Sequence, residues 1–324
     1  MSLCLVVQPI HSAGLERLRA AGIETRLASR ADMETVCAEI VEANAVITRS
    51  AGLSAAAMDH APRLRMVVSH GIGVDAIALD HAEVLGIAVA NTPDANRDSV
   101  AEHTIALMLA VAKRVPAADA ATRRADFDFK YHASLTDISG KVLGVVGYGG
   151  IGRRVAAIAR AGFGMEVVVH STSADPAELR ACGYRSSGSL EVLLEEADFV
   201  TLHRTLRKET RRLISARELE LMKPGAILIN TARGRLVDEA ALVAALSRGE
   251  LGGAALDVYE SEEMTLDHPL LSLPNVVLTP HSAGSSEEAL LRTAEQAAER
   301  VMAALAGERP ENLINPEMWK RRRR

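Results

Sequence analysis

Short apolar segments alternate with longer amphipathic segments along the chain, in two successive series. In the first series the apolar segments are 3–7, 45–48, 66–69 and 87–90. In the second they are 142–146, 167–170, 199–202, 227–230, 254–257 and 276–278. Such an alternation is typical of parallel strands joined by helices. The pattern therefore predicts an α/β fold with two doubly wound, Rossmann-like domains.

Two longer segments carry a helical pattern without glycine or proline, at 98–113 and 286–306. The first is long enough to link two domains, and the second could return the chain to the first domain. A length of 324 residues also suits two domains, since single domains commonly hold about 100–200 residues. We therefore expect two domains rather than one.

Composition and charge exclude several classes of protein. A formal net charge of −5 gives no general attraction to nucleic acid, and no apolar run approaches the roughly 20 residues of a membrane span. The first residues lack the features of a secretory signal, so we expect a cytoplasmic protein. Cys4, Cys37 and Cys182 are too far apart to indicate a disulfide framework or a metal site. The cations at 320–324 are expected to form a frayed, solvated terminus.

A glycine-rich turn follows the strand predicted at 142–146. It consists of Gly147, Tyr148, Gly149, Gly150, Ile151 and Gly152, and a helical pattern follows it. Glycines at this spacing permit a tight turn, a close approach to a pyrophosphate and close packing of the helix on the strand. The start of the helix then presents free N–H groups to the phosphates. The turn therefore predicts a dinucleotide site.

The next strand ends without the acid that usually binds the adenosine ribose about 20 residues further on. The residues there are His170, Ser171 and Thr172. Without a carboxylate the site has no barrier to a 2′-phosphate, so the sequence favours NADP over NAD. Arg153, Arg204 and Arg207 are candidate cations for that phosphate, and Asp175 could still supply an acid if the turn folds back.

Three segments late in the chain place reactive groups after predicted strands, where open parallel sheets bind ligands. They are 229–234 with Arg233, 256–262 with Glu262, and 278–284 with His281. An arginine, a carboxylate and an imidazole in one cleft would suit the reduction of a 2-oxo acid. Each residue alone has an ordinary structural explanation, as a surface charge, part of an acidic turn or a loop cap.

These segments and the rest of the chain resemble the D-isomer-specific 2-hydroxyacid dehydrogenases. The similar stretches are 71–75 (GIGVD), 91–93 (NTP), 99–102 (SVAE), the glycine turn, 219–225, 230–238, 254–262 and 275–284. The resemblance implies a Rossmann cofactor domain, 99–285, inserted into a flavodoxin-like substrate domain made of 1–98 and 286–324. It also implies a homodimer that acts on a small 2-oxo or 2-hydroxy acid.

The resemblance also assigns roles to single residues. Arg233 would bind the substrate carboxylate and polarise the 2-oxo group, His281 would exchange a proton with its oxygen, and Glu262 would orient that histidine. The backbone amides of the loop at 71–74 would bind the carboxylate as well. That loop consists of Gly71, Ile72, Gly73 and Val74. His203, Thr231, Ala232, Asp257 and Ala283 fall on the cofactor side, with Asp257 at the nicotinamide carboxamide.

Some features separate members of this family from one another. Arg49 and His70 lie near the substrate loop and are candidate substrate contacts, whereas Asp75 and Glu102 could equally serve domain packing. The segment 203–210 lacks a proline common in the family and adds Arg204 and Arg207 at the adenosine end. Glu263 stands where a proline commonly follows the catalytic glutamate.

Glyoxylate and hydroxypyruvate are the preferred substrates from the resemblance. Phosphoglycerate dehydrogenase is the nearest enzymatic alternative, whereas a formate dehydrogenase is disfavoured because that branch lacks the glutamate. A nucleotide-sensing scaffold, as in the corepressors that share this fold, is the alternative from another class. Turnover of a panel of 2-oxo acids distinguishes these hypotheses.

Overall fold

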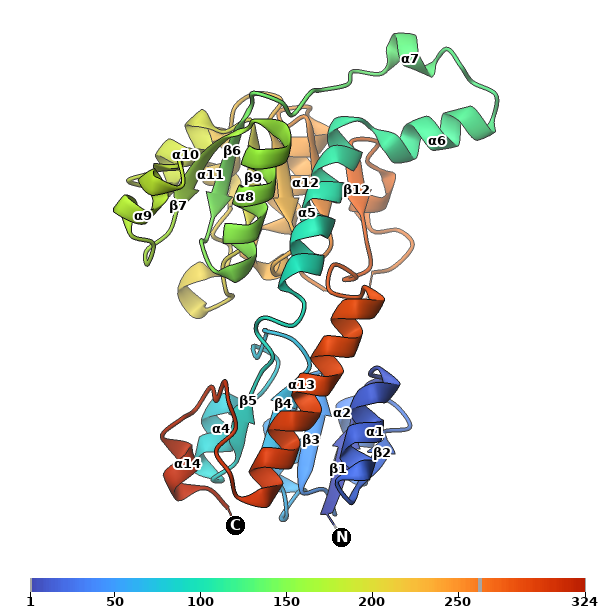
Figure 1. Ribbon diagram of the computed structural model, residues 1–324. Coiled ribbons are helices and arrows are strands. Elements are labelled where there is room, and N and C mark those ends of the chain that lie inside the picture. Colours follow the sequence, from blue (N-terminus) through green and yellow to red (C-terminus); the bar gives the residue numbers. More distant parts are fainter. Residues whose placement is uncertain (1, 262–263, 324) are drawn as a thin grey trace. The chain divides into compact units, whose positions relative to one another are not determined.

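The computed structural model describes residues 2–261 and 264–323. The chain forms two compact units, which Figure 1 shows with their elements labelled. Unit 1 comprises Met1–Asn96 and Gly284–Arg324, and unit 2 comprises Arg97–Ala283. Both contain a wholly parallel sheet with helices on its two faces. The predicted α/β fold class is therefore confirmed.

In the described part of unit 1, the sheet has five strands in the order β2-β1-β3-β4-β5, a flavodoxin-like arrangement. The strands are β1 Ser2–Val6, β2 Ile23–Leu27, β3 Ala45–Thr48, β4 Met66–Ser69 and β5 Ala88–Ala90. Helices α2 (Met33–Glu39), α3 (Ala55–Asp59) and α4 (Leu79–Val84) cover one face, and α1 (Ser12–Ala20) and α13 (Glu287–Ala306) cover the other. The carboxyl ends of all five strands therefore lie at one edge.

Helix α13 crosses the sheet of unit 1 and packs closely on α1. A methyl group added at Gly14 would lie 2.6 Å from the carbonyl oxygen of Ala294, so only a glycine fits there. Ser286 caps the start of α13 by accepting a hydrogen bond from the amide of Ala289, and Gly307 ends it in the left-handed conformation with φ 85°. The helix predicted at 286–306 is confirmed.

The basic tail is folded onto unit 1, so the expectation of a frayed terminus is wrong for Arg322 and Arg323. Arg322 and Arg323 follow the short helix α14, Met318–Arg321. The Arg322 guanidinium stacks 3.7 Å from the ring centre of Trp319 and donates to the carbonyl of Gly307, which ends α13. Arg323 donates to the carbonyl of Ala61 at 3.0 Å. The two cations are held by these hydrogen bonds to carbonyl groups and, for Arg322, by the ring of Trp319.

Over the described residues of unit 2, the sheet has seven strands in the order β12-β11-β10-β9-β6-β7-β8. Read from the other edge, this is the dinucleotide-binding order with one added strand. The strands are β6 Val142–Val146, β7 Glu166–His170, β8 Arg185–Ser186, β9 Phe199–Leu202, β10 Ile227–Asn230, β11 Gly253–Leu256 and β12 Val276–Leu278.

Helices cover both faces of this sheet. Helices α5 (Arg97–Ala112) and α8 (Gly150–Phe163) pack on one face, and α10 (Leu190–Glu196), α11 (Ala216–Leu221) and α12 (Glu239–Ser247) pack on the other. The remaining elements are α6 Val115–Arg123, α7 Phe129–His132, α9 Pro176–Ala181 and the 3-10 turns η1 Lys208–Thr210, η2 Gly234–Leu236 and η3 Pro269–Ser272. Among the described helices, none is both long and apolar enough to cross a membrane.

Candidate active site

The glycine turn connects β6 to α8, as predicted for a dinucleotide site. Gly147 has φ 99°, and a methyl group there would lie 2.5 Å from the carbonyl oxygen of His203. A methyl group at Gly152 would lie 2.2 Å from the carbonyl oxygen of Gly147. Both positions therefore require glycine, one for its backbone conformation and both for space.

Gly149 faces open space rather than protein. A methyl group at this position would meet nothing within 4 Å, and Gly149 caps α8 without a side-chain hydrogen bond. The first amides of α8 thus have no side-chain acceptor, and a helix of 14 residues places a partial positive charge at this end. Open space beside uncapped amides fits the pyrophosphate of a dinucleotide.

The end of β7 presents hydroxyl groups and a cation. Arg204 Nη1 donates to Thr172 Oγ1 at 3.3 Å, and the amide of Ser173 donates to Ser171 Oγ at 3.3 Å. Asp175 is occupied elsewhere, because its carboxylate accepts from the amide of Ala177 at 2.8 Å and caps α9. Among the described residues, no free carboxylate therefore stands at the end of β7 in the position of a ribose ligand, and Arg204 is the arginine that contacts this turn.

The other two candidate arginines differ from Arg204 in their surroundings. Arg153 forms a bidentate ion pair with Glu178, with one of its contacts at 3.2 Å, and lies 4.5 Å from the ring centre of Tyr148. The Arg207 side chain is exposed on the turn η1. Arg153 is thus already neutralised, and its ion pair holds α8 to α9.

Two histidines near this turn are held neutral by burial. Burial lowers the pKa of His203 to about 3, and its Nε2 lies 2.9 Å from Thr201 Oγ1. Burial, followed by the charge of Arg204, lowers the pKa of His170, whose Nδ1 is buried without a hydrogen-bond partner among the described residues. Neutral imidazoles leave Arg204 as the positive charge at the end of β7.

Arg233 follows β10 on a turn that Asn230 fixes. The Asn230 side chain accepts from the amide of Ala232 at 3.0 Å and donates to the carbonyl of Arg233 at 2.9 Å. Thr231 is buried, and its hydroxyl lies 2.8 Å from that of Thr104 on α5. These contacts fix the backbone that carries the arginine, whose guanidinium donates to the carbonyl of Ala232 at 2.7 Å.

Asp257 holds the loop that carries His281. Its fully buried carboxylate accepts from Thr279 Oγ1 at 2.6 Å, from the amide of Ser282 at 2.8 Å and from the amide of Ala283 at 2.9 Å. The Asp257 carbonyl accepts from the amide of His281 at 2.9 Å. His281 itself is exposed, with φ 51°. The imidazole is therefore presented by a loop anchored through one buried aspartate.

Glu262 lies outside the described residues, but the loop on either side of it is anchored. The Glu239 carboxylate accepts from the amide of Glu260 at 3.1 Å and lies 3.1 Å from Nε2 of His268. Tyr259 OH donates to the carbonyl of Thr279 at 2.7 Å. Tyr259, Glu260 and His268 are thus tied to α12 and to the His281 loop.

The loop at 71–74 belongs to unit 1 and follows β4. The amide of Gly71 is already used, since it donates to Thr92 Oγ1 at 2.9 Å and to the carbonyl of Ser69 at 3.0 Å. The carbonyls of Ile72 and Gly73 accept from Asn91 at 2.8 Å and Ser69 at 2.5 Å. The amides of 72–74 make no hydrogen bond with a described residue. The loop is therefore fixed through its carbonyls while three amides stay available.

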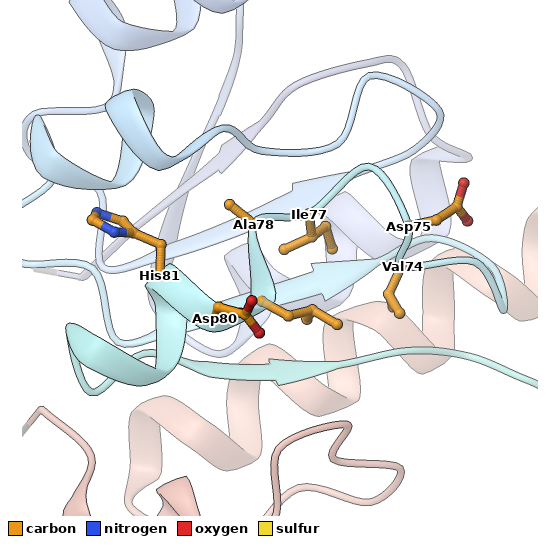
Figure 2. A pocket seen from close by; sticks show the side chains of 7 residues that line it. Val74, Asp75, Ile77, Ala78, Asp80 and His81 are labelled. Atoms are coloured by element: carbon orange, nitrogen blue, oxygen red, sulfur yellow. The ribbon is translucent and has the colours of Figure 1, made fainter. Parts of the chain in front are cut away.

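A hollow of about 400 Å³ lies next to this loop, lined by 74, 75 and 77–81. Figure 2 shows that Asp75 and Asp80 are among its lining residues. His81, at its other end, lies 2.7 Å from Asp59 Oδ1.

Several residues that shape the site carry no signal in the sequence. His103 on α5 places Nε2 3.1 Å from Thr279 Oγ1 and 3.6 Å from Asp257 Oδ1. Thr104, Glu239 and His268 likewise act on neighbours that are remote along the chain. Contacts of this kind arise from the fold, so a single sequence offers no pattern that would find them.

The family model described as "D-isomer specific 2-hydroxyacid dehydrogenase, NAD binding domain" matches residues 105–283. A glyoxylate reductase of Aeropyrum pernix is 42% identical over 89% of this chain and 87% of its own. A D-3-phosphoglycerate dehydrogenase of Methanocaldococcus jannaschii is 38% identical over 96% of this chain, which spans only 59% of that relative's length.

A solved structure is similar over the whole chain. It is the NADPH-dependent glyoxylate/hydroxypyruvate reductase of Sinorhizobium meliloti in complex with NADP and malonate. Its TM-score is 0.88 at 30% identity, covering 100% of this chain and 99% of that one. The similarity thus extends to both units, beyond the range of the family model.

Proposed function

The chain belongs to the D-isomer-specific 2-hydroxyacid dehydrogenases, and from that premise we propose that it reduces 2-oxo acids of the glyoxylate and hydroxypyruvate type to D-2-hydroxy acids. The observation that carries this proposal is the anchored pair of loops bearing Arg233 and His281 in the NAD(P)-binding unit. The names of the relatives from Aeropyrum pernix and Sinorhizobium meliloti support the choice of substrates.

The residues divide the reaction between them. Bound NAD(P)H supplies the hydride. Arg233 binds the substrate carboxylate through its planar set of N–H donors and polarises the 2-oxo group. His281 donates a proton to the oxygen of that group, and takes it back in the oxidative direction. Glu262 is proposed to orient His281, and the amides of 72–74 to donate to the carboxylate.

A panel assay tests this proposal. Purified protein is mixed with glyoxylate, hydroxypyruvate, pyruvate or phosphohydroxypyruvate and with NADPH or NADH, and the loss of nicotinamide absorbance is followed. We expect turnover of at least one of the first two substrates. Tight cofactor binding without turnover of any 2-oxo acid would instead favour a nucleotide-sensing scaffold.

We propose NADP as the preferred cofactor. The support is the absence of a carboxylate at the end of β7 together with the contact of Arg204 with Thr172. An arginine can bind the 2′-phosphate through charge-assisted hydrogen bonds, each worth about 1.5–3 kcal/mol. The engagement of Asp175 as the cap of α9 removes the remaining acid from competition.

Two variants test the cofactor preference. Arg204→Gln should raise the KM for NADPH by roughly 10-fold or more and leave that for NADH nearly unchanged, by the loss of one charge-assisted interaction. Ser171→Asp should shift the preference toward NADH, because a carboxylate repels the 2′-phosphate. Arg207→Gln, at the exposed residue before η1, shows whether the other candidate arginine contributes. An unchanged KM for NADPH in Arg204→Gln would show that Arg204 does not bind the phosphate.

A homodimer is the proposed assembly. The support comes from the segment around α6 and α7, which Figure 1 shows extending from the sheet of unit 2. It exposes Phe127 by 66%, Tyr131 by 72% and Leu135 by 52%, and exposed apolar side chains that gather on one segment are typical of an interface. Light scattering on the protein and on the double variant Phe127→Ser, Tyr131→Ser should show a dimer and a monomer, respectively.

Phosphoglycerate dehydrogenase activity is the second candidate. It is favoured by the similarity to the Methanocaldococcus jannaschii protein over 96% of this chain. The panel distinguishes the two candidates, because only this activity requires phosphohydroxypyruvate to be a far better substrate than hydroxypyruvate.

A further inference from the structure

Helix α5 supports the loop 279–283, which follows β12 and carries the proposed acid, from the helical side of unit 2. His103 on α5 places Nε2 3.1 Å from Oγ1 of Thr279, at the start of the loop. One helical turn earlier, Ser99 Oγ donates to the carbonyl of Ala283, at its end, at 2.8 Å. Residues four apart lie on one face of a helix, so this face of α5 contacts both ends of the loop.

The hydrogen bonds of the Thr279 hydroxyl determine which atom of His103 is the donor. Thr279 Oγ1 lies 2.6 Å from Oδ1 of Asp257, and a carboxylate can only accept the hydroxyl proton. Because the hydroxyl has no second proton, its oxygen must accept from the imidazole. The imidazole proton is therefore assigned to Nε2, as in the neutral Nε2–H tautomer or the imidazolium. Nε2 also lies 3.6 Å from Oδ1 of the fully buried Asp257, so the same N–H stabilises that carboxylate electrostatically.

The two residues reached by His103 hold the backbone of His281. The amide of His281 donates to the carbonyls of Asp257 and Thr279 at 2.9 and 3.1 Å. The Asp257 carboxylate accepts from the next two amides, those of Ser282 and Ala283, at 2.8 and 2.9 Å. With φ 51°, His281 keeps a conformation that persists where its surroundings determine it. A donor that fixes the Thr279 hydroxyl thus acts on the backbone that presents the proposed acid.

The loop that carries Arg233 is supported by other contacts. The Asn230 side chain donates to the carbonyl of Arg233 at 2.9 Å, and the hydroxyl of Thr231 lies 2.8 Å from that of Thr104. These contacts do not involve His103. Loss of the His103 donor should therefore disturb the proposed acid and spare the proposed carboxylate ligand.

We propose that His103 is a positioning residue for the reduction. Its Nε2–H directs the Thr279 hydroxyl toward Asp257 and so holds His281 where it can exchange a proton with the substrate oxygen. His103 acts through this loop and does not touch the substrate. The assignment rests on the proposed function, since its effect on turnover requires His281 to be the general acid.

Two variants of His103 test the role by steady-state kinetics with NADPH and glyoxylate or hydroxypyruvate. His103→Leu removes the donor and should lower kcat by roughly 10-fold, the scale of one lost hydrogen bond. The KM for the 2-oxo acid should stay within about twofold, because the Arg233 loop keeps its own contacts. His103→Gln should restore kcat to within about twofold of the wild-type value, since the glutamine Nε2 lies as many bonds from Cα as the imidazole Nε2 and also donates.

His60→Leu and His60→Gln are the matched controls, because His60 is exposed at the end of α3 in unit 1. Neither should change kcat or KM. Unfolding curves for all four variants show whether a loss of activity follows a loss of fold. An unchanged kcat in His103→Leu would overturn the proposal. An equal loss in His103→Gln, or a rise in KM as large as the fall in kcat, would overturn it as well.

Amide hydrogen exchange, measured on the full chain without substrate, separates this proposal from the proposed function. In His103→Leu the amides of 281–283 should exchange roughly 10-fold faster or more, because their acceptors are less firmly held, and His103→Gln should restore slow exchange. If this pattern appears in a protein that reduces no 2-oxo acid, His103 holds the loop and the proposed reaction fails. If these amides exchange equally in the wild-type protein and His103→Leu, the positioning role is wrong whatever the activity.

Discussion

His281 combines an exposed imidazole with a left-handed backbone conformation, which residues other than glycine adopt in only a few per cent of cases. Its φ of 51° is maintained by hydrogen bonds from its amide to the carbonyls of Asp257 and Thr279. A left-handed residue costs of order 1 kcal/mol or more and persists where the surroundings determine it. The conformation is thus a specific property of the loop, consistent with a residue that must be presented at a defined place.

Replacement of His281 should separate catalysis from binding. His281→Ala is expected to lower kcat by roughly 10²-fold or more, the usual contribution of a general acid, and to leave the dissociation constant of NADPH within about threefold. The measurement is steady-state kinetics beside a fluorescence titration of the nucleotide. His60→Ala is the control, because His60 is exposed on unit 1. A kcat close to that of the wild-type protein would remove His281 from its proposed role.

Asp257 acts on the site through the loop that it holds. Asp257→Asn keeps the size of the side chain but replaces one acceptor with a donor, which must then face an amide or the Thr279 hydroxyl. We expect the free energy of unfolding to fall by about 1–3 kcal/mol, the cost of an unpaired buried polar group, and kcat to fall as His281 loses its position. Asp119→Asn, which affects an exposed pair with Arg123, should change neither quantity. Normal kcat in Asp257→Asn would show that the loop holds its conformation without this carboxylate.

At the scale of residues, the sequence shows which chemical groups are present but not which partner each polar side chain binds. Asp175 and Arg153 were both reasonable candidates near the ribose, yet one caps α9 and the other is paired with Glu178. Arg204 was one of three candidate arginines, and the structure distinguishes it by its contact with Thr172. Which partner a polar side chain takes depends on neighbours brought close by the fold, so a list of residue types leaves this choice open.

Elements with an apolar pattern could be predicted, and elements without one could not. The strand segments proposed near β1, β3–β7 and β9–β12 agree with the structure because each is an apolar run, and all of them except β12 are largely buried between two layers of helices. The predicted set lacks β2 and β8, which lie at the edges of their sheets. β2 has the sequence IETRL with most side chains at least partly exposed, and β8 is two residues long. Edge strands need no continuous apolar run, so their pattern resembles that of a loop.

The close contact between α8 and the turn after β6 depends on Gly152, which has no Cβ atom. Gly152→Ala would place Cβ 2.2 Å from the backbone oxygen of Gly147, which cannot move without displacing the turn. We expect the free energy of unfolding to fall by about 1–3 kcal/mol, as for other overpacked sites, and the dissociation constant of NADPH to rise by more than 10-fold. Calorimetric titration measures the second effect directly.

Gly162→Ala supplies the control within the same helix. A methyl group at Gly162 meets nothing within 4 Å, so this variant should bind NADPH normally and gain about 0.5–1 kcal/mol of stability from its better helix propensity. If Gly152→Ala behaves like Gly162→Ala, the close approach of helix and turn is not what shapes the nucleotide site.

Each of the two units contains a histidine that is neutral in the folded protein, and together they predict how the whole molecule responds to acid. The pKa of His70 in unit 1 is about 4, and that of His203 in unit 2 is about 3, against an ordinary value of 6.5. Between pH 6.5 and the folded-state pKa values, His70 and His203 bind protons in the unfolded chain but not in the folded chain. Stability is therefore fully present above pH 6.5 and is lost as the pH falls.

Lowering the pH from 7 to 5 should decrease the free energy of unfolding by about 2 kcal/mol for each of these histidines, with most Asp and Glu side chains of the unfolded chain still ionised. The single tryptophan, Trp319, belongs to unit 1, so its fluorescence follows that unit while circular dichroism follows both. His70→Asn should make the stability measured by fluorescence less dependent on pH. His203→Gln should leave the fluorescence result unchanged and make the stability measured by circular dichroism less dependent on pH. Equal stability of the wild-type protein at both pH values would contradict the burial of both rings in neutral form.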